Sequence, residues 1–403
     1  MKPFKNLKVI ELANVLAGPA VGQFFAELGA EVIKIENVNT QGDVTRKWKT
    51  PNEKSDYDIS AYFSSVNWGK KSIALNFRKT EAIEIVNRLV SLSDIIIASY
   101  KPGDAKQLSV DYESLKKINE KIIYAEVTGY GNDESRVGYD AIIQAECGFT
   151  YLNGELNGDP IKMPVALMDV LAAHQLKEAI LIALIERMRT NKGSKIEVSL
   201  IQTGIASLAN QSANWLVGGF IPERIGSDHP NIVPYGTIFN TADNKMIVLA
   251  VGTDKQFQGL CDVLEISETG VHSNYSTNTL RIKNKDELNK ILKDRISKIQ
   301  KATLLEKLKK QNIPAGSIND MKEVFDMNVA KEILLSATSK EQINFTGVRT
   351  NVFKINNDLP DAVLSIPPHY AQHTEEIIIE TLGFALHEIE TLEKNNVIEV
   401  FKS

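Results

Sequence analysis

The sequence predicts an α/β protein whose first half is Rossmann-like and is followed by a smaller α+β block. Over residues 1–130, short runs of β-branched residues alternate with helical patterns. This alternation is typical of a mostly parallel sheet covered by helices on both faces. A loop rich in glycine and proline follows at residues 218–230, and it marks a domain boundary or an active-site loop.

The predicted strands are short apolar runs bounded by polar residues or glycine. In chain order they are residues 7–12, 31–36, 72–77, 94–99, 122–127 and 195–200. Helical patterns occupy residues 21–28, 81–92, 112–118 and 170–189. Gly29 and Gly193 follow the first and last of these helices, where glycine suits a helix C-terminus. In such a sheet, ligands are expected at the carboxyl ends of the strands.

The second half of the chain has a different pattern. Residues 235–251 predict a hairpin that turns at residues 242–245, and residues 283–311 predict lysine-rich helices. Helical patterns return at residues 376–382 and 388–394. Periodicity alone does not show which domain these last residues join.

Composition and charge bound the function. The chain has 403 residues, too many for one hydrophobic core. Hydrophobic residues make up 43% and charged residues 24%, which is typical of ordinary globular proteins. A formal charge of -5 gives no general attraction to nucleic acid or to an anionic membrane. Any anionic ligand must therefore be held by a local basic patch.

Targeting and metal-binding signals are weak. The start, MKPFKNLKVIEL, lacks the apolar stretch of a signal peptide, and no later segment is long enough to span a bilayer. We therefore expect a cytoplasmic protein. Cys147 and Cys261 have no CxxC spacing and are expected to be buried thiols. His369 and His373 have metal-like spacing, but two prolines precede them and no acidic third ligand is placed, so no metal site is expected.

Two loops are candidates for binding an anion. Residues 13–22 lead into a helix N-terminus, whose free N–H groups accept phosphates or polarised carbonyls; the alternative is a tight glycine turn. Residues 67–79 contain four basic residues and no acidic one. Arg78 lies at the carboxyl end of its strand and could clamp a phosphate with Lys101. The alternative is that Lys70, Lys71 and their neighbours are solvated strand ends.

Asp169 is the one acidic residue of MPVALMDVLAAH at residues 163–174, with four apolar neighbours on each side. A helical pattern begins directly after it, and aspartate is a favoured N-cap because its carboxylate accepts N–H groups of the first turn. Such bonds keep a partly buried carboxylate ionised, and an ionised carboxylate in an apolar setting is a usable nucleophile. The local sequence leaves both roles open.

Eleven stretches, the Asp169 stretch among them, indicate a family when they are taken together and in order, although no single one of them does. They are GPAVGQ at 18–23, LGAEVIKIE at 28–36, GDVTR at 42–46, NWGKKSI at 67–73, KPG at 101–103, GYG at 129–131, GYD at 138–140, the Asp169 stretch, TNKG at 190–193, QHTEEI at 372–377 and LG at 382–383. Together they resemble the motifs of class III (CaiB/BaiF) CoA-transferases over nearly the whole chain.

This resemblance implies an architecture and a reaction. The large domain would contain residues 1–222 and 335–403, the inserted smaller domain residues 223–334, and two subunits would interlock as a homodimer. Asp169 would attack an acyl-CoA thioester to form a mixed anhydride, and the CoA thiolate would then attack the aspartyl carbonyl to form an enzyme–CoA thioester. An acceptor acid would complete the exchange. Coenzyme A thioesters are thus substrates, and no permanently bound cofactor is expected.

The resemblance also implies contacts to CoA at four places. The matching positions are Leu16 and Ala17; Leu75, Asn76, Phe77 and Arg78; Tyr100 and Lys101; and Val137, Gly138, Tyr139 and Asp140. The chain departs from the family at Asn37 and near Gln107, where basic residues are common. Arg46 and His229 are weaker candidates for contacts to the acid, each with a structural alternative.

Within the family, the sequence resembles succinyl-CoA:glutarate-type dicarboxylate CoA-transferases. The stretches concerned are GYDA at 138–141, NGDP at 157–160, IVPY at 232–235 and LRIKN at 280–284. HPNIV at 229–233 replaces the glycine-rich lid of formyl-CoA transferase-like members, which disfavours formyl and oxalyl substrates. The expected activity moves CoA from a donor such as succinyl-CoA to a small acid, most simply a dicarboxylic acid.

Two alternatives remain. An α-methylacyl-CoA racemase shares the fold and the aspartate, but its second acid/base is a histidine where Tyr139 stands here. A phenol holds its proton near pH 7, which disfavours this chemistry. A catalytically silent acyl-CoA-binding protein is the other alternative.

Overall fold

The computed structural model describes residues 2–340, 342–359 and 363–402, and the chain divides into two compact units. Unit 1 contains residues 1–149, 162–213 and 332–403, and unit 2 contains residues 150–161 and 214–331. The segment 150–161 belongs to unit 2 because Arg224 donates to the carbonyls of Gly158 and Tyr151. From the sequence, this segment was expected in the large domain, residues 1–222.

Unit 1 is built on a seven-stranded sheet with the order β12-β3-β2-β1-β4-β5-β6. The parallel strands are β1 (Lys8–Leu12), β2 (Glu31–Asn37), β3 (Lys71–Leu75), β4 (Ile95–Ala98), β5 (Ile123–Thr128) and β6 (Ser194–Ser199). Each overlaps a strand predicted from the sequence, so the expected α/β class with a parallel-dominated sheet is confirmed. The order 3-2-1-4-5-6 is that of a doubly wound sheet, whose direction of growth switches between β1 and β4.

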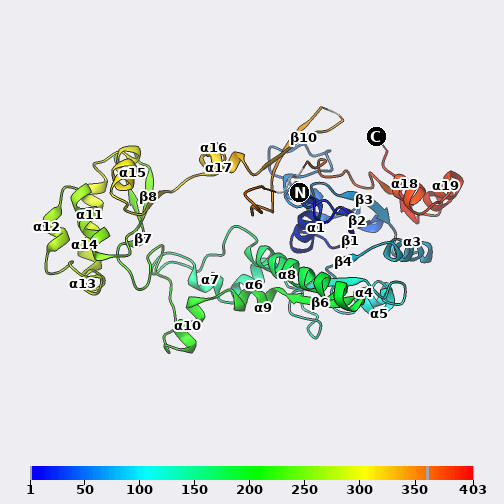
Figure 1. Ribbon diagram of the computed structural model, residues 1–403, viewed down its shortest axis with the longest axis horizontal. Helices are drawn as coiled ribbons and strands as arrows, with labels where there is room; N and C mark the ends of the chain where they lie inside the picture. Colours follow the sequence, from blue (N-terminus) through cyan, green and yellow to red (C-terminus); the bar gives the residue numbers. More distant parts are fainter. Residues whose placement is uncertain (1, 341, 360–362, 403) are drawn as a thin grey trace. The chain divides into compact units, whose positions relative to one another are not determined.

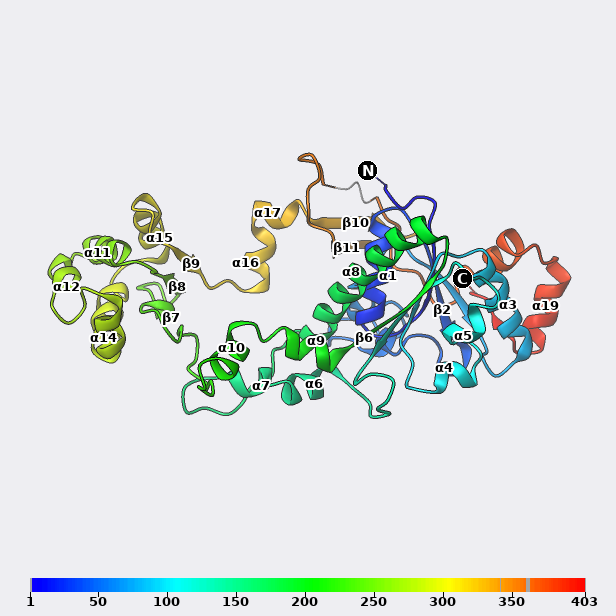
Figure 2. The same ribbon diagram turned by 60° about the horizontal axis from the view of Figure 1, so that its bottom comes forward.

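Helices cover both faces of this sheet. Successive strand residues point to opposite faces, so Val9 packs with α1 (Ala17–Glu27) and α8 (Leu167–Thr190), whereas Ile10 packs with α3 (Thr80–Ser91). Figures 1 and 2 show α1 beside α8. The same figures show the C-terminal helix α19 (Leu386–Lys394) beside α3.

The remaining elements of unit 1 are short. They are the helical turns η1 (Val38–Thr40) and η2 (Val44–Lys47), helices α2 (Ala61–Ser64), α4 (Asp104–Gln107), α5 (Tyr112–Leu115), α6 (Asp140–Glu146), α9 (Leu200–Ala206) and α18 (Thr374–Glu376), the π-helical turn η3 (Ile377–Thr381), and the antiparallel pair β10 (Leu334–Thr338) and β11 (Asn344–Val348). Helices α7 (Phe149–Leu152) and α10 (Asn210–Leu216) span the unit boundaries.

Unit 2 has its own antiparallel sheet, β7-β8-β9. The strands β7 (Tyr235–Asn240) and β8 (Met246–Ala250) confirm the predicted hairpin. The other elements are β9 (Ala315–Ser317) and helices α11 (Asp254–Val263), α12 (Ser267–Val271), α13 (Asn278–Lys283), α14 (Lys285–Ile296), α15 (Lys301–Lys310), α16 (Met321–Asp326) and α17 (Asn328–Lys331). Cys261 lies in this core and Cys147 in the core of unit 1, both as buried free thiols, as predicted.

The C-terminal segment completes the sheet of unit 1. β12 (Ile398–Glu399) pairs antiparallel with β3. Ahead of it, His373 Nδ1 accepts a bond from the N–H of Ser72, and Thr374 Oγ1 accepts one from the N–H of Ala74. His369 instead contacts Asp58, at 2.5 Å. The two histidines precede α18 and therefore do not share a helix face.

Buried charged side chains link β1, β2 and the loops that follow them. Lys34 Nζ lies 3.0 Å from Glu11 Oε1 and 3.0 Å from Asp43 Oδ2. Burial opposes the charged form of Lys34, but Asp43 and Glu11 more than offset this and raise its pKa. Lys70, expected in solvent, is buried instead, with Nζ 2.7 Å from Glu11 Oε2. Burial lowers its pKa to about 8, although Glu11 acts in the opposite direction.

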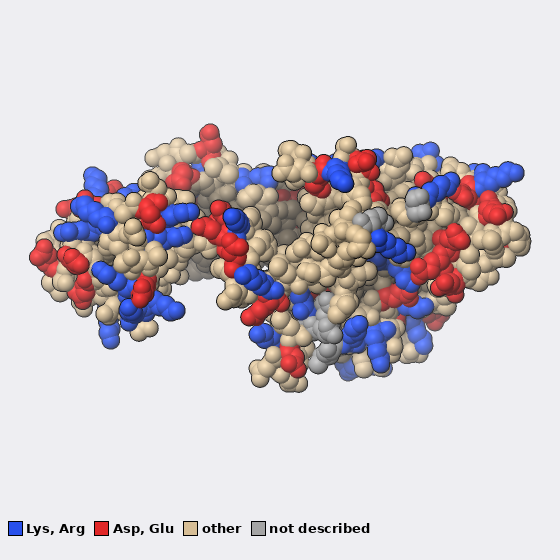
Figure 3. All heavy atoms as spheres, turned by 90° about the horizontal axis from the view of Figure 1, so that it is seen from above, with Lys and Arg blue, Asp and Glu red and all other residues tan. Residues whose placement is uncertain are grey.

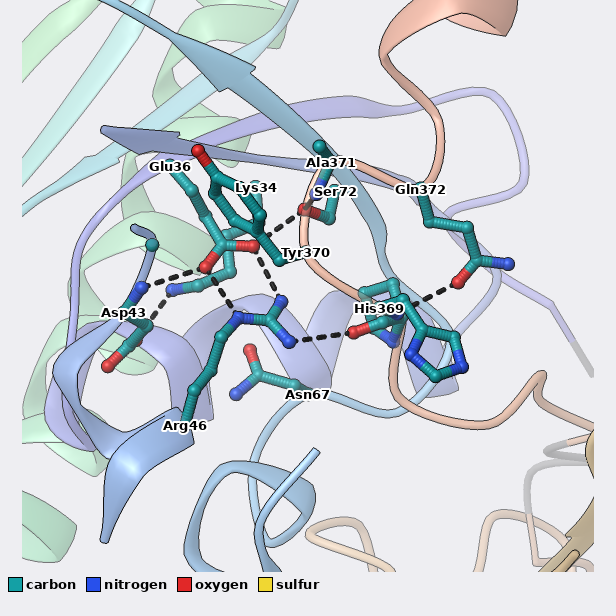
Figure 4. Close-up of polar contacts among 12 residues, drawn as sticks. Lys34, Glu36, Asp43, Arg46, Asn67, Ser72, His369, Tyr370, Ala371 and Gln372 are labelled. Carbon is teal, nitrogen blue, oxygen red and sulfur yellow. Dashed lines mark hydrogen bonds and ion pairs between the residues drawn. The ribbon is translucent and has the colours of Figure 1, made fainter. Parts of the chain in front are cut away.

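Glu36 and Arg46 form a second buried pair (Figure 4). Arg46 donates to both carboxylate oxygens of Glu36, at 2.6 and 2.8 Å. Its remaining nitrogen donates to the carbonyl oxygens of Asp58 and Pro368, at 3.2 and 3.1 Å. Burial would raise the pKa of Glu36, but Arg46 outweighs it and holds that pKa below its usual value. This pair therefore ties the C-terminal segment to β2.

One face of the molecule is mixed in charge. On the face drawn in Figure 3, lysine and arginine side chains are interspersed with aspartate and glutamate. Mixed signs of this kind are typical of globular surfaces and give no broad field for steering a polyanion.

We expect Arg46→Ala to lower the free energy of unfolding by about 3–5 kcal/mol, because it leaves Glu36 buried and unpaired. Urea unfolding measures the loss. Arg78→Ala, which removes an exposed arginine from the turn after β3, is the matched control and should change the free energy by less than about 0.5 kcal/mol. Equal effects of the two substitutions would show that the buried pair adds nothing.

Candidate active site

A cavity of about 190 Å³ lies at the carboxyl ends of β1, β4, β5 and β6. It is lined by Asn14, Val15, Ala17, Ser99, Tyr100, Lys101, Pro102, Val127, Thr128, Gly129, Arg136, Val137, Gly138, Tyr139, Asp140, Asp169 and Leu200. The residues after β1 and β4 flank the switch point of the sheet, which is where doubly wound proteins bind their ligands. Asp169 is therefore placed where chemistry is expected.

Asp169 lies in the first turn of α8 but does not cap it. The N-cap position belongs to Ala166, and Asp169 is the third helical residue. The carboxylate that accepts a first-turn N–H is that of Asp140, whose Oδ1 lies 2.8 Å from the nitrogen of Met168. The predicted N-cap role of Asp169 is wrong because the helix begins at Leu167, three residues earlier than the periodicity indicated.

Asp140 is itself held in place by Gln144, one turn along α6. Gln144 Nε2 donates to Asp140 Oδ2 at 2.7 Å, and Gln144 Oε1 accepts from the N–H of Met163 at 2.8 Å. Gln144 is fully buried. Helix α6 thus fixes both the start of α8 and the loop that leads into it.

The electrostatic environment of Asp169 differs from the expectation. Burial, and second the negative charge of Asp140, raise the pKa of Asp169 to about 7. Within the described residues, no hydrogen bond or ion pair to the Asp169 carboxylate offsets these two effects. The N–H of Met168, in the first turn of α8, bonds to Asp140 and not to Asp169. At pH 7 the side chain is therefore near the midpoint of its titration, and its ionised form is poorly solvated.

Two glycines bring the cavity walls together. A Cβ on Gly138 would lie 2.4 Å from Gly129 Cα, and a Cβ on Gly129 would lie 2.6 Å from Gly138 Cα. Because real side chains do not tolerate such distances, both positions require glycine. This close approach seats residues 136–140 against the end of β5 and explains why the GYG and GYD motifs occur together.

The turn after β1 is strained. Val15 has a φ of +71°, a left-handed conformation that is a genuine outlier for a β-branched residue. Its N–H faces the carboxylate of Asp43, 3.2 Å from Oδ2. Residues in such conformations persist only where their surroundings hold them, and they cluster at functional sites.

Several of the predicted CoA-contacting residues meet Asp169 in this cavity. They are Ala17, Tyr100, Lys101, Val137, Gly138, Tyr139 and Asp140. Leu16 is the N-cap residue of α1 and packs against the core beside them. Leu75 is the last residue of β3, and Asn76, Phe77 and Arg78 follow it; none of the four lines the cavity. Their contact with CoA stays a prediction.

The weaker candidates lie elsewhere. Arg46 is buried and bonded to Glu36, and it does not line the Asp169 cavity. His229 belongs to unit 2, where its ring packs against Tyr235 at 5.1 Å. Asn37 Oδ1 accepts from the N–H of Asn39, and Gln107 is the exposed last residue of α4.

Other residues that line the cavity were not singled out from the sequence. Ser99 and Thr128 stand at and just beyond the ends of predicted strands, and this position could have indicated them. Val15 lies within the candidate loop at residues 13–22 but was not named individually. Arg136 lies over the ring of Tyr130, at 4.0 Å, and donates to Glu146 at 2.9 Å. It is the one basic residue among acidic neighbours, Asp133 and Glu134, so the local sequence does not indicate a basic cluster.

Comparisons with known proteins settle the family. The model of CoA-transferase family III matches residues 4–374. The chain belongs to CoA-transferase family III. It is 37% identical to succinate–glutarate CoA-transferase of Agrobacterium fabrum, over 94% of this chain and 95% of that one. It is 34% identical to human succinyl-CoA:glutarate CoA-transferase, over 95% and 87% of the two chains.

A solved structure agrees. The crystal structure of a CaiB/BaiF family protein from Brucella suis superposes with a TM-score of 0.84 at 37% identity, covering 94% of this chain and 99% of that one. Membership of this family makes the protein a CoA-transferase, which acts on CoA thioesters. Among the described residues, no helix is long and apolar enough to cross a membrane.

We expect Asp169→Asn to stabilise the protein more at pH 8 than at pH 5. The folded-state pKa of Asp169, about 7, is above the unfolded value of about 3.9. The stability contributed by this side chain is therefore fully present below the unfolded pKa and is lost as the pH rises through the folded pKa. Asparagine does not ionise and escapes this loss. Melting temperatures of both proteins at the two pH values measure the difference, and a gain that is the same at both would rule out the raised pKa.

Proposed function

We propose that this CoA-transferase moves CoA from succinyl-CoA or a similar donor to a small dicarboxylic acid, with Asp169 as the nucleophile. The position of Asp169 carries the proposal, since it places a poorly solvated carboxylate in a cavity at the switch point of the sheet. The names of the relatives described above support dicarboxylates as the substrate class. Cytoplasmic location stays a prediction.

The reaction proceeds through two covalent states of Asp169. An ionised Asp169 oxygen attacks the thioester carbonyl, and the C–S bond breaks. This step forms a mixed anhydride between Asp169 and the donor acid and releases CoA as a thiolate. The thiolate then attacks the aspartyl carbonyl, which releases the donor acid as its carboxylate and leaves an enzyme–CoA thioester. An acceptor carboxylate reverses these steps and departs as the new CoA thioester. No net proton is gained or lost.

The surroundings of Asp169 suit these steps. Burial excludes water, which would hydrolyse the anhydride. It also leaves the ionised carboxylate with few hydrogen bonds to break before attack. Lys101 and Arg136 line the cavity as cations and can hold CoA phosphates through charge-assisted hydrogen bonds. The cavity accommodates a thioester and a small acid more readily than a whole nucleotide, so the adenine end of CoA would extend beyond it.

Incubation of the wild-type protein with succinyl-CoA and glutarate is expected to yield glutaryl-CoA. Asp169→Ala should abolish this product, because the other carboxylate lining the cavity, that of Asp140, is already bonded to the N–H of Met168 and to Gln144. Liquid chromatography with mass spectrometry measures the esters, and intact-protein mass spectrometry after donor alone measures the enzyme–CoA adduct. A panel of dicarboxylates of other lengths and acetate defines the acceptor.

The matched control is Asp104→Ala, which removes a carboxylate from α4 outside the cavity and should retain transfer. Full activity of Asp169→Ala would refute the mechanism. Binding of acyl-CoA without any adduct would instead identify a silent binding protein. Exchange of the substrate α-proton in deuterated water, without CoA transfer, would identify a racemase.

We further propose that the protein is a homodimer. Ile182, Ile185 and Met188 lie on one side of α8 with 67%, 61% and 86% of their surface exposed. Neighbouring large apolar side chains that are exposed on one side of a helix are typical of surfaces that another chain covers. The interlocked arrangement implied by the family resemblance stays a prediction.

Light scattering after size exclusion is expected to give twice the chain mass for the wild type. Ile185→Glu should shift the protein towards the monomer, because a charge in an apolar interface loses its water. Leu386→Glu, at an exposed position on α19, should leave the mass unchanged. A monomeric wild type would contradict the proposal.

A further inference from the structure

The strained turn at Val15 is closed by a buried ion pair. Lys34 Nζ donates to the carbonyl oxygen of Ala13 at 2.7 Å, and Asp43 accepts from the N–H of Val15 at 3.2 Å. Lys34 and Asp43 contact each other at 3.0 Å. The two peptide groups on either side of Asn14 are therefore attached to the two members of one ion pair.

The ion pair is itself anchored on both sides. Asp43 Oδ1 accepts from the N–H and the hydroxyl of Thr45, at 3.0 and 2.8 Å. Lys34 also contacts Glu11 of β1, at 3.0 Å. Lys34, Glu11, Asp43 and Thr45 are all fully buried, so none of these bonds can be exchanged for one to water. Figure 4 shows Lys34 and Asp43 turned towards each other.

The turn held in this way forms part of the Asp169 cavity. Asn14, Val15 and Ala17 line it, and the turn leads directly into α1 at Ala17. On the other side, the N–H of Asn14 donates to Ser99 Oγ, after β4. The conformation of Val15 therefore sets where this wall stands relative to the residues that follow β4.

We propose that Asp43 is a positioning residue of the transferase: through Val15 it holds the turn after β1 in a left-handed conformation and so keeps the wall of the Asp169 cavity in its reactive geometry. The inference rests on the proposed function and extends it to a residue outside the cavity. A purely structural role for Asp43 would affect stability without depending on the backbone preference of residue 15.

The test compares Asp43→Asn in two backgrounds, Val15→Gly and Val15→Ala. Both background substitutions remove the two γ-methyl groups of Val15, but only glycine adopts a positive φ without strain. Asp43→Asn is expected to lower kcat about 10- to 100-fold in the wild-type and Val15→Ala proteins, because small displacements of reacting groups cost that much. In the Val15→Gly background the loss should be less than about threefold, since the turn no longer needs to be held. KM for the acyl-CoA should change less than kcat.

A matched control and a milder variant complete the design. Asp58 carries another carboxylate paired with Arg46 and His369, and Asp58→Asn should have the same effect in both backgrounds. If Asp43→Asn does not fold, Thr45→Val removes one bond to Asp43 at nearly constant volume and is compared in the same two backgrounds. Hydrogen exchange of peptides covering residues 13–18 should accelerate in Asp43→Asn and Thr45→Val.

The outcomes separate the two claims. Equal losses of kcat in the glycine and alanine backgrounds, or unchanged hydrogen exchange in residues 13–18, would overturn the inference while leaving the transferase function intact. A wild-type protein that transfers no CoA would overturn the proposed function, and the inference with it.

Discussion

The ion pair between Lys34 and Asp43 is the interaction that connects β1, β2 and the loops after them, including the turn that lines the Asp169 cavity. Two charges removed from water are costly, and they are tolerated only where the geometry is good and the remaining donors and acceptors are satisfied. Here Glu11, Thr45 and two backbone groups supply those partners. Because each bond is short and directional, the network fixes positions more sharply than apolar packing does. It joins β1, β2 and the loop after β2 near the carboxyl ends of these strands.

Capping of α8 and nucleophilic attack were both expected of Asp169, but the cavity has two carboxylates, Asp140 and Asp169, and only Asp140 caps the helix. Asp140 satisfies a first-turn N–H of α8, and this leaves Asp169 free of such bonds. A carboxylate without donors is destabilising when ionised, and the neighbouring charge makes it more so. The protein accepts this cost in a helix whose other face packs into the core of unit 1 through residues such as Met168, Leu176 and Ile180. Reactivity and stability are thus assigned to different residues. Asp140 reaches the first turn of α8 only through a tertiary contact, because 28 positions separate it from Met168 in the chain.

The sequence predicted the sheet well because its signals are local. The six parallel strands and the hairpin β7–β8 follow from apolar runs and turn residues, and Asp169 stood out as a charge in an apolar stretch. The features it did not predict depend on distant partners. The cap of α8 comes from another helix, and Lys34 and Lys70 are buried only because carboxylates from other elements meet them. The left-handed Val15 has no signal of its own, since valine normally indicates a strand.

The pairing of β12 with β3 has a consequence for how the chain is made. An uncovered edge strand offers its backbone groups to any other extended chain. Asn76, at the end of β3, donates to the carbonyl of Asn396, and 320 residues separate the two. During translation, the edge of β3 therefore stays uncovered until the residues around Asn396 have left the ribosome, and unit 2 is synthesised in the meantime. A prematurely terminated product would keep the edge open, which makes the last residues a safeguard against misassembly of nascent chains.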